Sequence, residues 1–365
     1  MIAIFFYHCD RFFDFRDWHV KNDVSSLLSG LHTAFFVHWM MPLFFVISGA
    51  SAYFALKSRT AGGYVKERFV RILLPFLILG PVVTSPPQIY LDRLTHSQFT
   101  GNFFTFFPSY FHGFAEFGGN FAWHGMHLWY LLYLFIFSMI ALPVILPGKA
   151  TGRSLLSVSA RLFEHPLALF LLFLPLSAVD ILIDYLGMGF SRATGGWSFL
   201  SYFPLFIYGY LIFSNALILE TVRKYATIAL IAAVSLSAYD LFMRFGVKPT
   251  VYYGEPVYIF NMITRGCRAW CWIIAILGFG RRFLNFNNPF LKYANESVLP
   301  FYILHQLIIL LIGFYVVGLN LSIPGKYLLI ATFSFSMIII LYHFLIRPTP
   351  LLRFLFGLRR FKQPA

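Results

Sequence analysis

The sequence predicts an all-α protein, a polytopic transmembrane helical bundle with about ten spans, the first of which is truncated at its N-terminus. Of its 365 residues, 59% are hydrophobic and only 12% are charged, about half the charged fraction of an average soluble domain. Residues 132–146 run unbroken as LYLFIFSMIALPVIL, unlike the short alternating segments of an outer-membrane barrel. Backbone polar groups have no water partners in hydrocarbon, which favours helices. We therefore expect one integral membrane domain over residues 1–365.

Nine apolar segments are each long enough to cross a bilayer, which takes about 20 residues. They cover about residues 33–55, 69–87, 127–147, 165–186, 197–216, 225–243, 257–280, 297–318 and 326–346. Residues 1–13, MIAIFFYHCDRFF, look like the outer half of a further span. A basic region and a small-residue cleavage site are missing there, so we expect no cleavable signal peptide and a chain that begins inside its first helix.

The formal net charge of +14 would indicate nucleic-acid binding in a soluble domain, but here we attribute it to membrane topology. Basic residues cluster at about 57–71, 149–161, 223–224, 281–292 and 347–362, between alternate apolar segments. Because basic residues collect in cytoplasmic loops, this alternation supports the span count and predicts that Met1 lies toward the cytoplasm. We expect membrane lipids as partners and no nucleic acid.

His8 is the first candidate catalytic residue, because it ends the first apolar run in the sequence HCDRFFDFRDW. An imidazole with an unperturbed pKa of about 6.5 can take a proton from a hydroxyl and later return it. We expect Asp10 or Asp14 to orient the ring. The alternative is an interfacial cluster that anchors the end of the helix.

Two arginines stand at the cytoplasmic end of the third predicted span. Arg68 and Arg71 are three residues apart and precede Pro75, so on a helix they share one face. Guanidinium groups bind phosphate through two parallel hydrogen bonds, which suits a phosphate-bearing ligand. The alternative is ordinary positive-inside charge in contact with lipid headgroups. Upstream, the small residues 48–51 in the second span indicate close helix packing.

Two further ionisable residues lie deep in predicted spans. Arg268 at that depth requires an anionic or carbonyl partner, and the aspartates of other spans offer three candidates, Asp180, Asp184 and Asp240. We interpret it first as a structural ion pair and second as a contact to substrate charge. His305, followed by Gln306, either makes a buried helix contact or lines an internal cavity.

The sequence predicts no metal site. His124 and His127 are three apart, but no third ligand lies at a useful spacing, and an interfacial aromatic belt explains the neighbouring Trp129. The three cysteines, Cys9, Cys267 and Cys271, are too few for a disulfide framework. We interpret them as packing residues.

The motifs together resemble the acyltransferase-3 superfamily of integral membrane acyltransferases. The resemblance rests on five motifs in order along nearly the whole chain: HCDRFFDF, PLFFVISGA, the RxxRxxxP pattern of Arg68–Pro75, HLWYL and LPFYILHQ. It implies ten spans in a bacterial inner (cytoplasmic) membrane. It also implies transfer of an acyl group, acetyl or succinyl, from cytoplasmic acyl-CoA to a hydroxyl of an extracytoplasmic glycan or similar acceptor.

The resemblance also assigns residues. His8 takes the place of a histidine that is essential in the family, and Arg68 and Arg71 take the place of a pair thought to meet acyl-CoA. We expect acyl-CoA as a donor substrate and no permanently bound cofactor. Arg268 or His305 would contact substrate and stabilise the oxyanion. Family members usually carry an arginine about one span upstream of the histidine, so we expect a misassigned start or an incomplete chain.

The alternative function is transport of a polar or lipid-linked saccharide. Ten spans and the embedded Arg268 and His305 are compatible with a transporter. Transporters often carry paired structural repeats, however, and the two halves of this sequence show no similarity to each other. The sequence therefore favours the acyltransferase.

Overall fold

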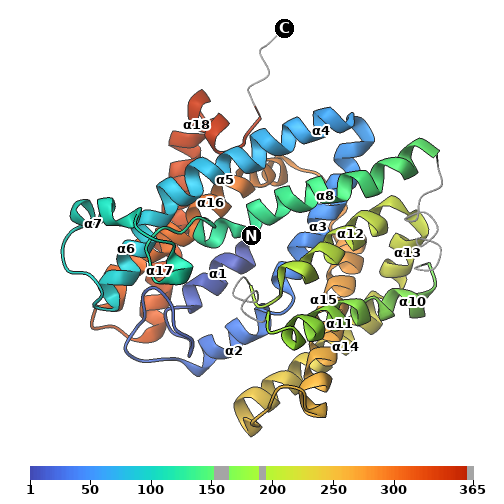
Figure 1. Cartoon of the computed structure of the whole chain (residues 1–365), viewed down its shortest axis with the longest axis horizontal. Coiled ribbons are helices and arrows are strands. Elements are labelled where there is room, and N and C mark those ends of the chain that lie inside the picture. Colours follow the sequence, from blue (N-terminus) through green and yellow to red (C-terminus); the bar gives the residue numbers. More distant parts are fainter. Residues whose placement is uncertain (152–163, 189–194, 360–365) are drawn as a thin grey trace. The chain divides into compact units, whose positions relative to one another are not determined.

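The computed structural model describes residues 1–151, 164–188 and 195–359, with side chains described outside 147–151. This part of the chain is helical, and its only β-type pairing is an isolated bridge between Phe114 and Phe121. The predicted all-α fold is confirmed (Figure 1). The predicted basic clusters at 149–161 and 347–362 lie partly outside the described residues.

The elements in chain order are α1 (Ile2–Asp10), α2 (Leu27–Phe36), α3 (Met40–Ser58), α4 (Ala61–Arg68), η1 (Phe69–Leu73), α5 (Leu74–Leu79), η2 (Gly80–Thr84), α6 (Ser85–Thr95), α7 (Phe103–Tyr110), η3 (Ala115–Phe117), η4 (Met126–Leu128), α8 (Trp129–Thr151), α10 (Pro166–Leu171), α11 (Phe173–Tyr185), α12 (Phe199–Ser214), α13 (Ala216–Lys224), α14 (Ala226–Leu241), η6 (Phe242–Val247), α15 (Pro256–Phe283), α16 (Pro289–Val317), α17 (Ile323–Ile340), η7 (Leu341–Ile346) and α18 (Pro350–Leu355). η3 and η4 are 3-10 turns, whereas η1, η2, η6 and η7 are π-helical.

The described residues contain eight helical stretches long and apolar enough to cross a membrane, or nine if one bent pair counts as a span. The eight are Leu27–Ser58, Ala61–Thr95, Met126–Leu146, Pro166–Tyr185, Ala226–Val247, Pro256–Phe283, Pro289–Val317 and Ile323–Ile346. The bent pair is α12 with α13, and each of the nine predicted segments overlaps one of these stretches. The predicted count of about ten is thus roughly consistent, because α1, the tenth, has only nine residues.

The break between α12 and α13 has a local cause at Asn215. Its backbone is extended, with φ −125° and ψ 117°, and its side chain accepts hydrogen bonds from the backbone N–H groups of Leu217 and Ile218. An asparagine that caps the following helix in this way ends the preceding one. The chain bends by 101° there, so the predicted span at 197–216 ends at Ser214.

The chain divides into two compact units. The first comprises residues 1–33, 66–135 and 287–365, and the second comprises residues 34–65 and 136–286.

In the first unit, α1 packs on α16 and α17 through a buried apolar cluster. Phe5, Cys9 and Phe12 are almost completely buried in it, and the Phe5 ring lies 5.7 Å from that of Phe301. Gly313 on α16 leaves room for the Phe12 ring, which a Cβ at that position would overlap. The short α1 is therefore held by packing, and Cys9 is a packing residue as predicted.

In the second unit, α3 and α12 approach each other at backbone distance. A Cβ added at Gly49 would overlap the carbonyl oxygen of Phe206, and one added at Gly209 would overlap that of Val46. Small residues allow this close approach in membrane helices. The close packing predicted from the small residues 48–51 is confirmed.

We expect Gly49→Val to destabilise the second unit, because the new side chain meets backbone atoms that cannot rotate away. Overpacking a tight site costs about 1–3 kcal/mol. The apparent melting temperature of the protein in detergent should fall by several degrees. The control is Gly62→Ala, because a Cβ at Gly62 meets open space. Equal melting temperatures for both variants would contradict the proposed contact.

Candidate active site

His8 lies in the last turn of α1, in the first unit, between aromatic and histidine side chains. Its ring stacks on Trp18, with centroids 5.9 Å apart and an interplanar angle of 21°. The His305 ring lies 5.1 Å from His8 on another side. His8 Nδ1 is buried, and none of the described residues forms a hydrogen bond with it. The predicted catalytic histidine therefore presents an unsatisfied nitrogen within a packed environment.

His305 and His127 extend this site into a cluster of three imidazoles. Their ring centroids are 5.0 Å apart, His305 is completely buried, and His127 is 7% exposed. The Tyr302 hydroxyl donates to the backbone carbonyl of His127, which joins α16 to the start of α8. HLWYL and LPFYILHQ are separate motifs in the sequence. The structure brings their histidines together, with His305 next to His8.

Backbone carbonyls determine the tautomers of the two partner histidines. His305 Nδ1 lies 2.6 Å from the Tyr302 carbonyl oxygen, and His127 Nε2 lies 3.2 Å from that of Ile303. A carbonyl oxygen only accepts, so these nitrogens carry the protons of the neutral rings. The opposite nitrogens, His305 Nε2 and His127 Nδ1, are buried and have no hydrogen-bond partner among the described residues. The cluster thus offers two lone pairs, and the one on His305 belongs to the ring that contacts His8.

The two aspartates expected to orient His8 have other partners. Asp10 Oδ2 lies 2.5 Å from Nδ1 of His32 on α2. Asp14 pairs with Arg11, and its Oδ1 lies 2.9 Å from Lys21 Nζ. The side chains packed on His8 are instead those of Trp18 and His305. Which side chains contact His8 depends on the direction in which the chain turns after α1. The spacing of residues in the sequence does not reveal that direction.

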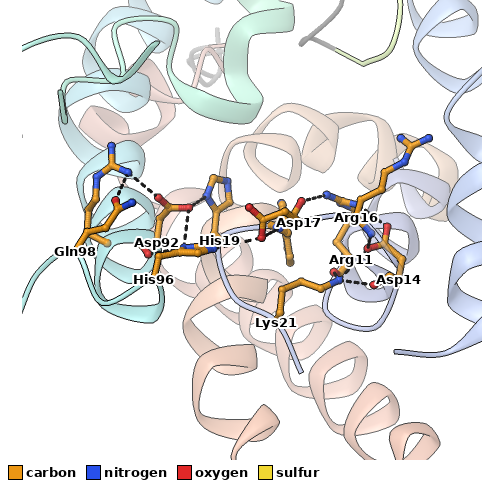
Figure 2. A network of polar contacts seen from close by, with 11 residues as sticks. Arg11, Asp14, Arg16, Asp17, His19, Lys21, Asp92, His96 and Gln98 are labelled. Carbon is orange, nitrogen blue, oxygen red and sulfur yellow. Dashed lines mark hydrogen bonds and ion pairs between the residues drawn. The ribbon is translucent and has the colours of Figure 1, made fainter. Parts of the chain in front are cut away.

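Asp14 is the centre of a charged loop that follows α1, shown in Figure 2. Its side chain is 1% exposed and is paired with two cations, Arg11 and Lys21. Arg11 Nη2 also donates to the Asp17 carbonyl at 2.6 Å, and Lys21 Nζ donates to the Arg11 carbonyl at 2.8 Å. These bonds fold residues 11–21 back on themselves. Trp18, carried by this loop, is thereby held against His8.

A second set of contacts ties the loop to the end of α6. His19 Nδ1 lies 2.9 Å from Asp92 Oδ1, and His96 Nε2 lies 3.3 Å from Asp17 Oδ1 (Figure 2). The backbone carbonyl of Asp92 and the carboxylate of Asp17, both acceptors for the ring, raise the pKa of His96 despite partial burial. His96 therefore acts as a donor to the Asp17 carboxylate, and His19 supplies a second contact between the loop and Asp92.

Arg68 and Arg71 lie at the junction of α4 and η1. Arg71 Nε donates to the Gly357 carbonyl at 2.8 Å, and its Nη1 lies 3.1 Å from Glu67. η1 is π-helical, and its wider turn separates positions three apart by more than an α-helix does. The contact with Gly357 joins Arg71 to the C-terminal region. In that region Arg353 is paired with Glu296 at 2.7 Å.

Arg268 belongs to the second unit, and His305 to the first. Arg268 is 4% exposed, and its Nη1 lies 2.6 Å from Asp240 Oδ2. The structural ion pair predicted for it is confirmed. The other two candidate acids have different partners: Asp180 accepts from Ser201 at 2.5 Å, and Asp184 accepts from Tyr258.

The histidines considered for a metal site have other contacts. His124 is paired with Glu116, and His127 lies against the Ile303 carbonyl. Burial lowers the pKa of His124, although Glu116 opposes this shift. No group of three or more His, Cys, Asp or Glu side chains in the described part of the chain could hold a metal ion.

The apolar spans and the imidazole cluster define a multi-pass helical membrane protein with an internal site suited to proton transfer. The model of the acyltransferase-3 family, described as an acyltransferase domain, matches residues 1–346. The chain belongs to this family of membrane acyltransferases, as its motifs predicted, and is an O-acyltransferase.

Two relatives that are similar over most of their length share one name. Glucans biosynthesis protein C of Salmonella gallinarum is 25% identical over 363 residues, which cover 96% of this chain and 90% of that protein. The protein of the same name from Escherichia coli is 26% identical over 364 residues, with the same coverage. No solved structure matches the chain.

We expect Asp14→Asn to destabilise the loop after α1, because Arg11 and Lys21 lose the negative charge that balances them. Breaking a buried ion pair costs about 3–5 kcal/mol, which should lower the melting temperature of the protein in detergent. The matched control is Asp17→Asn, whose side chain is 82% exposed and whose pairing contributes about 0–1 kcal/mol. If both variants have the same melting temperature, Asp14 does not organise the loop.

Proposed function

We propose that this protein transfers an acetyl or succinyl group from cytoplasmic acyl-CoA to a hydroxyl of an extracytoplasmic glycan, in the inner membrane of a bacterium. The observation that carries the proposal is the buried cluster of His8, His305 and His127, with its unsatisfied ring nitrogens. The glycan acceptor is supported by the name of the relatives, glucans biosynthesis protein C.

His8 acts as the general base in this mechanism. It takes the proton of the acceptor hydroxyl while the hydroxyl oxygen attacks the thioester carbonyl carbon. The tetrahedral adduct collapses, the C–S bond breaks, and the His8 imidazolium returns the proton to the departing CoA sulfur. The products are an acylated glycan and free CoA, and the step requires no further reactant.

His305 is a positioning residue for His8. Its Nδ1 proton is committed to the Tyr302 carbonyl, so the neutral ring presents an acceptor at Nε2 and no donor for an oxyanion. When His8 becomes an imidazolium, this lone pair can accept from it and stabilise the charge, as a carboxylate does in a hydrolase triad. This assignment replaces the oxyanion role expected for His305.

The arginines that contact the start of α16 are separated from the imidazole cluster along the axis of this helix. Glu296, which pairs with Arg353, precedes His305 by nine residues, a rise of about 13 Å along a helix. Arg71 joins the same end through the Gly357 carbonyl, and its Nη2 donors can meet a phosphate group. A CoA bound there by Arg68 and Arg71 would extend its thioester arm toward His8.

We expect His8→Ala to reduce acyl transfer by about 10²–10⁴-fold, the usual contribution of a general base. The assay follows label from acetyl- or succinyl-CoA into a glucan, with purified protein in lipid nanodiscs. His112→Ala removes an exposed histidine and should leave the rate unchanged. Full transfer by the His8 variant would remove the mechanism. Label that stays on CoA with the wild-type protein would favour the alternative, a saccharide transporter.

We expect His305→Leu to lower kcat by about 10- to 100-fold, which is at or below the lower end of what a general base itself contributes, because His305 acts only through His8. The KM for either substrate should change little, because His305 acts through His8. His305→Gln offers an amide oxygen in place of the Nε2 lone pair and should recover part of kcat. If Leu and Gln variants are equally impaired, or if only KM changes, His305 does not position His8.

A further inference from the structure

An open groove lies beside the end of α6 and is bordered by α7 and the segment that follows it. Its volume is about 410 Å³, within the range of roughly 300–1,000 Å³ typical of small-molecule sites. Four polar side chains and two rings line it: Arg93, Gln98, Ser109, Asn120, Phe99 and Phe106. We call it the α6–α7 groove. Because it is open rather than enclosed, it can admit part of a longer chain.

Arg93 fixes the orientation of the two amides in this groove. Its Nε donates to Asn120 Oδ1 at 3.0 Å, and its Nη1 donates to Gln98 Oε1 at 2.7 Å. A guanidinium only donates, so both amides must turn their oxygens toward it and their NH₂ groups away. Asn120 uses one of its N–H groups on the Ser109 carbonyl at 3.1 Å. The remaining amide donors are therefore preset for a ligand.

The charge of Arg93 is already balanced. Its Nη1 lies 3.2 Å from Asp92 Oδ2, and its Nη2 donates to the Gly119 carbonyl at 2.8 Å. Asp92 in turn pairs with His19 and His96. The groove thus offers oriented donors without a free positive charge, which favours neutral oxygen acceptors over phosphate or carboxylate groups.

Aromatic surface completes the chemistry. The rings of Phe99 and Phe106 pack against each other with centroids 5.3 Å apart, and Phe99 is the more exposed of the two. A sugar ring combines hydroxyl oxygens around its rim with an apolar C–H face, so it matches a site that pairs amide donors with an aromatic wall. Ser109 Oγ, which donates to the Phe106 carbonyl, keeps acceptor capacity for a sugar hydroxyl.

We propose that the α6–α7 groove binds sugar units of the glycan acceptor. This inference rests on the proposed function, because it identifies where that acceptor is held. Side-chain contacts connect the groove to the candidate active site: Arg93 pairs with Asp92, Asp92 pairs with His19, and the neighbouring Trp18 stacks on His8. A glycan anchored in the groove would therefore lie at the same end of the first unit as the catalytic imidazole.

The test measures glucan binding directly. A glucan oligosaccharide of defined length is titrated calorimetrically into the full-length protein in nanodiscs, with inorganic phosphate as a second probe. Gln98→Met keeps the side-chain length and removes both amide donors, and Phe99→Leu keeps apolar bulk and removes the ring. Each should weaken glucan binding about five- to tenfold. Gln98→Met loses hydrogen bonds to neutral groups, each of which costs a few-fold, and Phe99→Leu loses the flat aromatic face that packs on the sugar ring.

Thr100→Val is the matched control, because it changes an exposed side chain in the same loop that does not line the groove. It should bind glucan like the wild type. Absence of glucan binding by the wild type, phosphate binding in its place, or equal affinities of all three variants would overturn the proposal. Melting temperatures confirm that each variant is folded.

Binding and transfer measurements together distinguish an error in the groove proposal from an error in the proposed acyltransferase function. If the wild type acylates the glucan but the groove variants keep its KM, the acyltransferase stands and the groove proposal is wrong. If the wild type binds glucan through Gln98 and Phe99 but transfers no label, the groove stands and the proposed reaction is wrong. His8→Ala should retain glucan binding while losing transfer.

Discussion

The ion pairs of Asp14 are the interaction on which the candidate active site most depends. α1 is short, and the chain must leave it, reverse and still hold a ring against His8. A carboxylate that is 1% exposed requires positive partners, and Arg11 and Lys21 come from both sides of the turn. Their other donors bind backbone carbonyls of the same loop, as Figure 2 shows for the charged side chains. Balancing one charge therefore also fixes the position of Trp18 against His8.

In the second unit, buried charged side chains within the spans are also paired with opposite charges. Arg268 on α15 is paired with Asp240 on α14, and Arg265 on α15 lies 3.8 Å from Asp180 on α11. An arginine at membrane depth is costly unless it is paired. These pairs therefore link α15 to two neighbouring helices. The pair with Asp240 is sufficient to explain an arginine at position 268, and no contact with substrate charge is needed.

The membrane-spanning segments could be predicted from the composition of the sequence. Contacts between residues far apart in the sequence could not, because they depend on how the chain runs in space. Nine segments follow from apolar length alone, because each must match the thickness of a bilayer. The break at Asn215 was not predicted, although an asparagine before a basic amphipathic stretch is a capping signal. His8, Arg68 and Arg71 were chosen from motifs, whereas the meeting of His127 with His305 requires knowing that α8 starts beside α16.

Cys9 raises the question of whether the acyl group first moves to the protein, because it is the immediate neighbour of His8. Consecutive residues of a helix point about 100° apart, since a turn takes 3.6 residues. His8 accordingly faces Trp18 and His305, while Cys9 is completely buried in the apolar cluster with Phe5 and Phe12. A thiol enclosed in this way cannot reach a thioester carbonyl, which argues for direct transfer to the acceptor hydroxyl rather than transfer through Cys9.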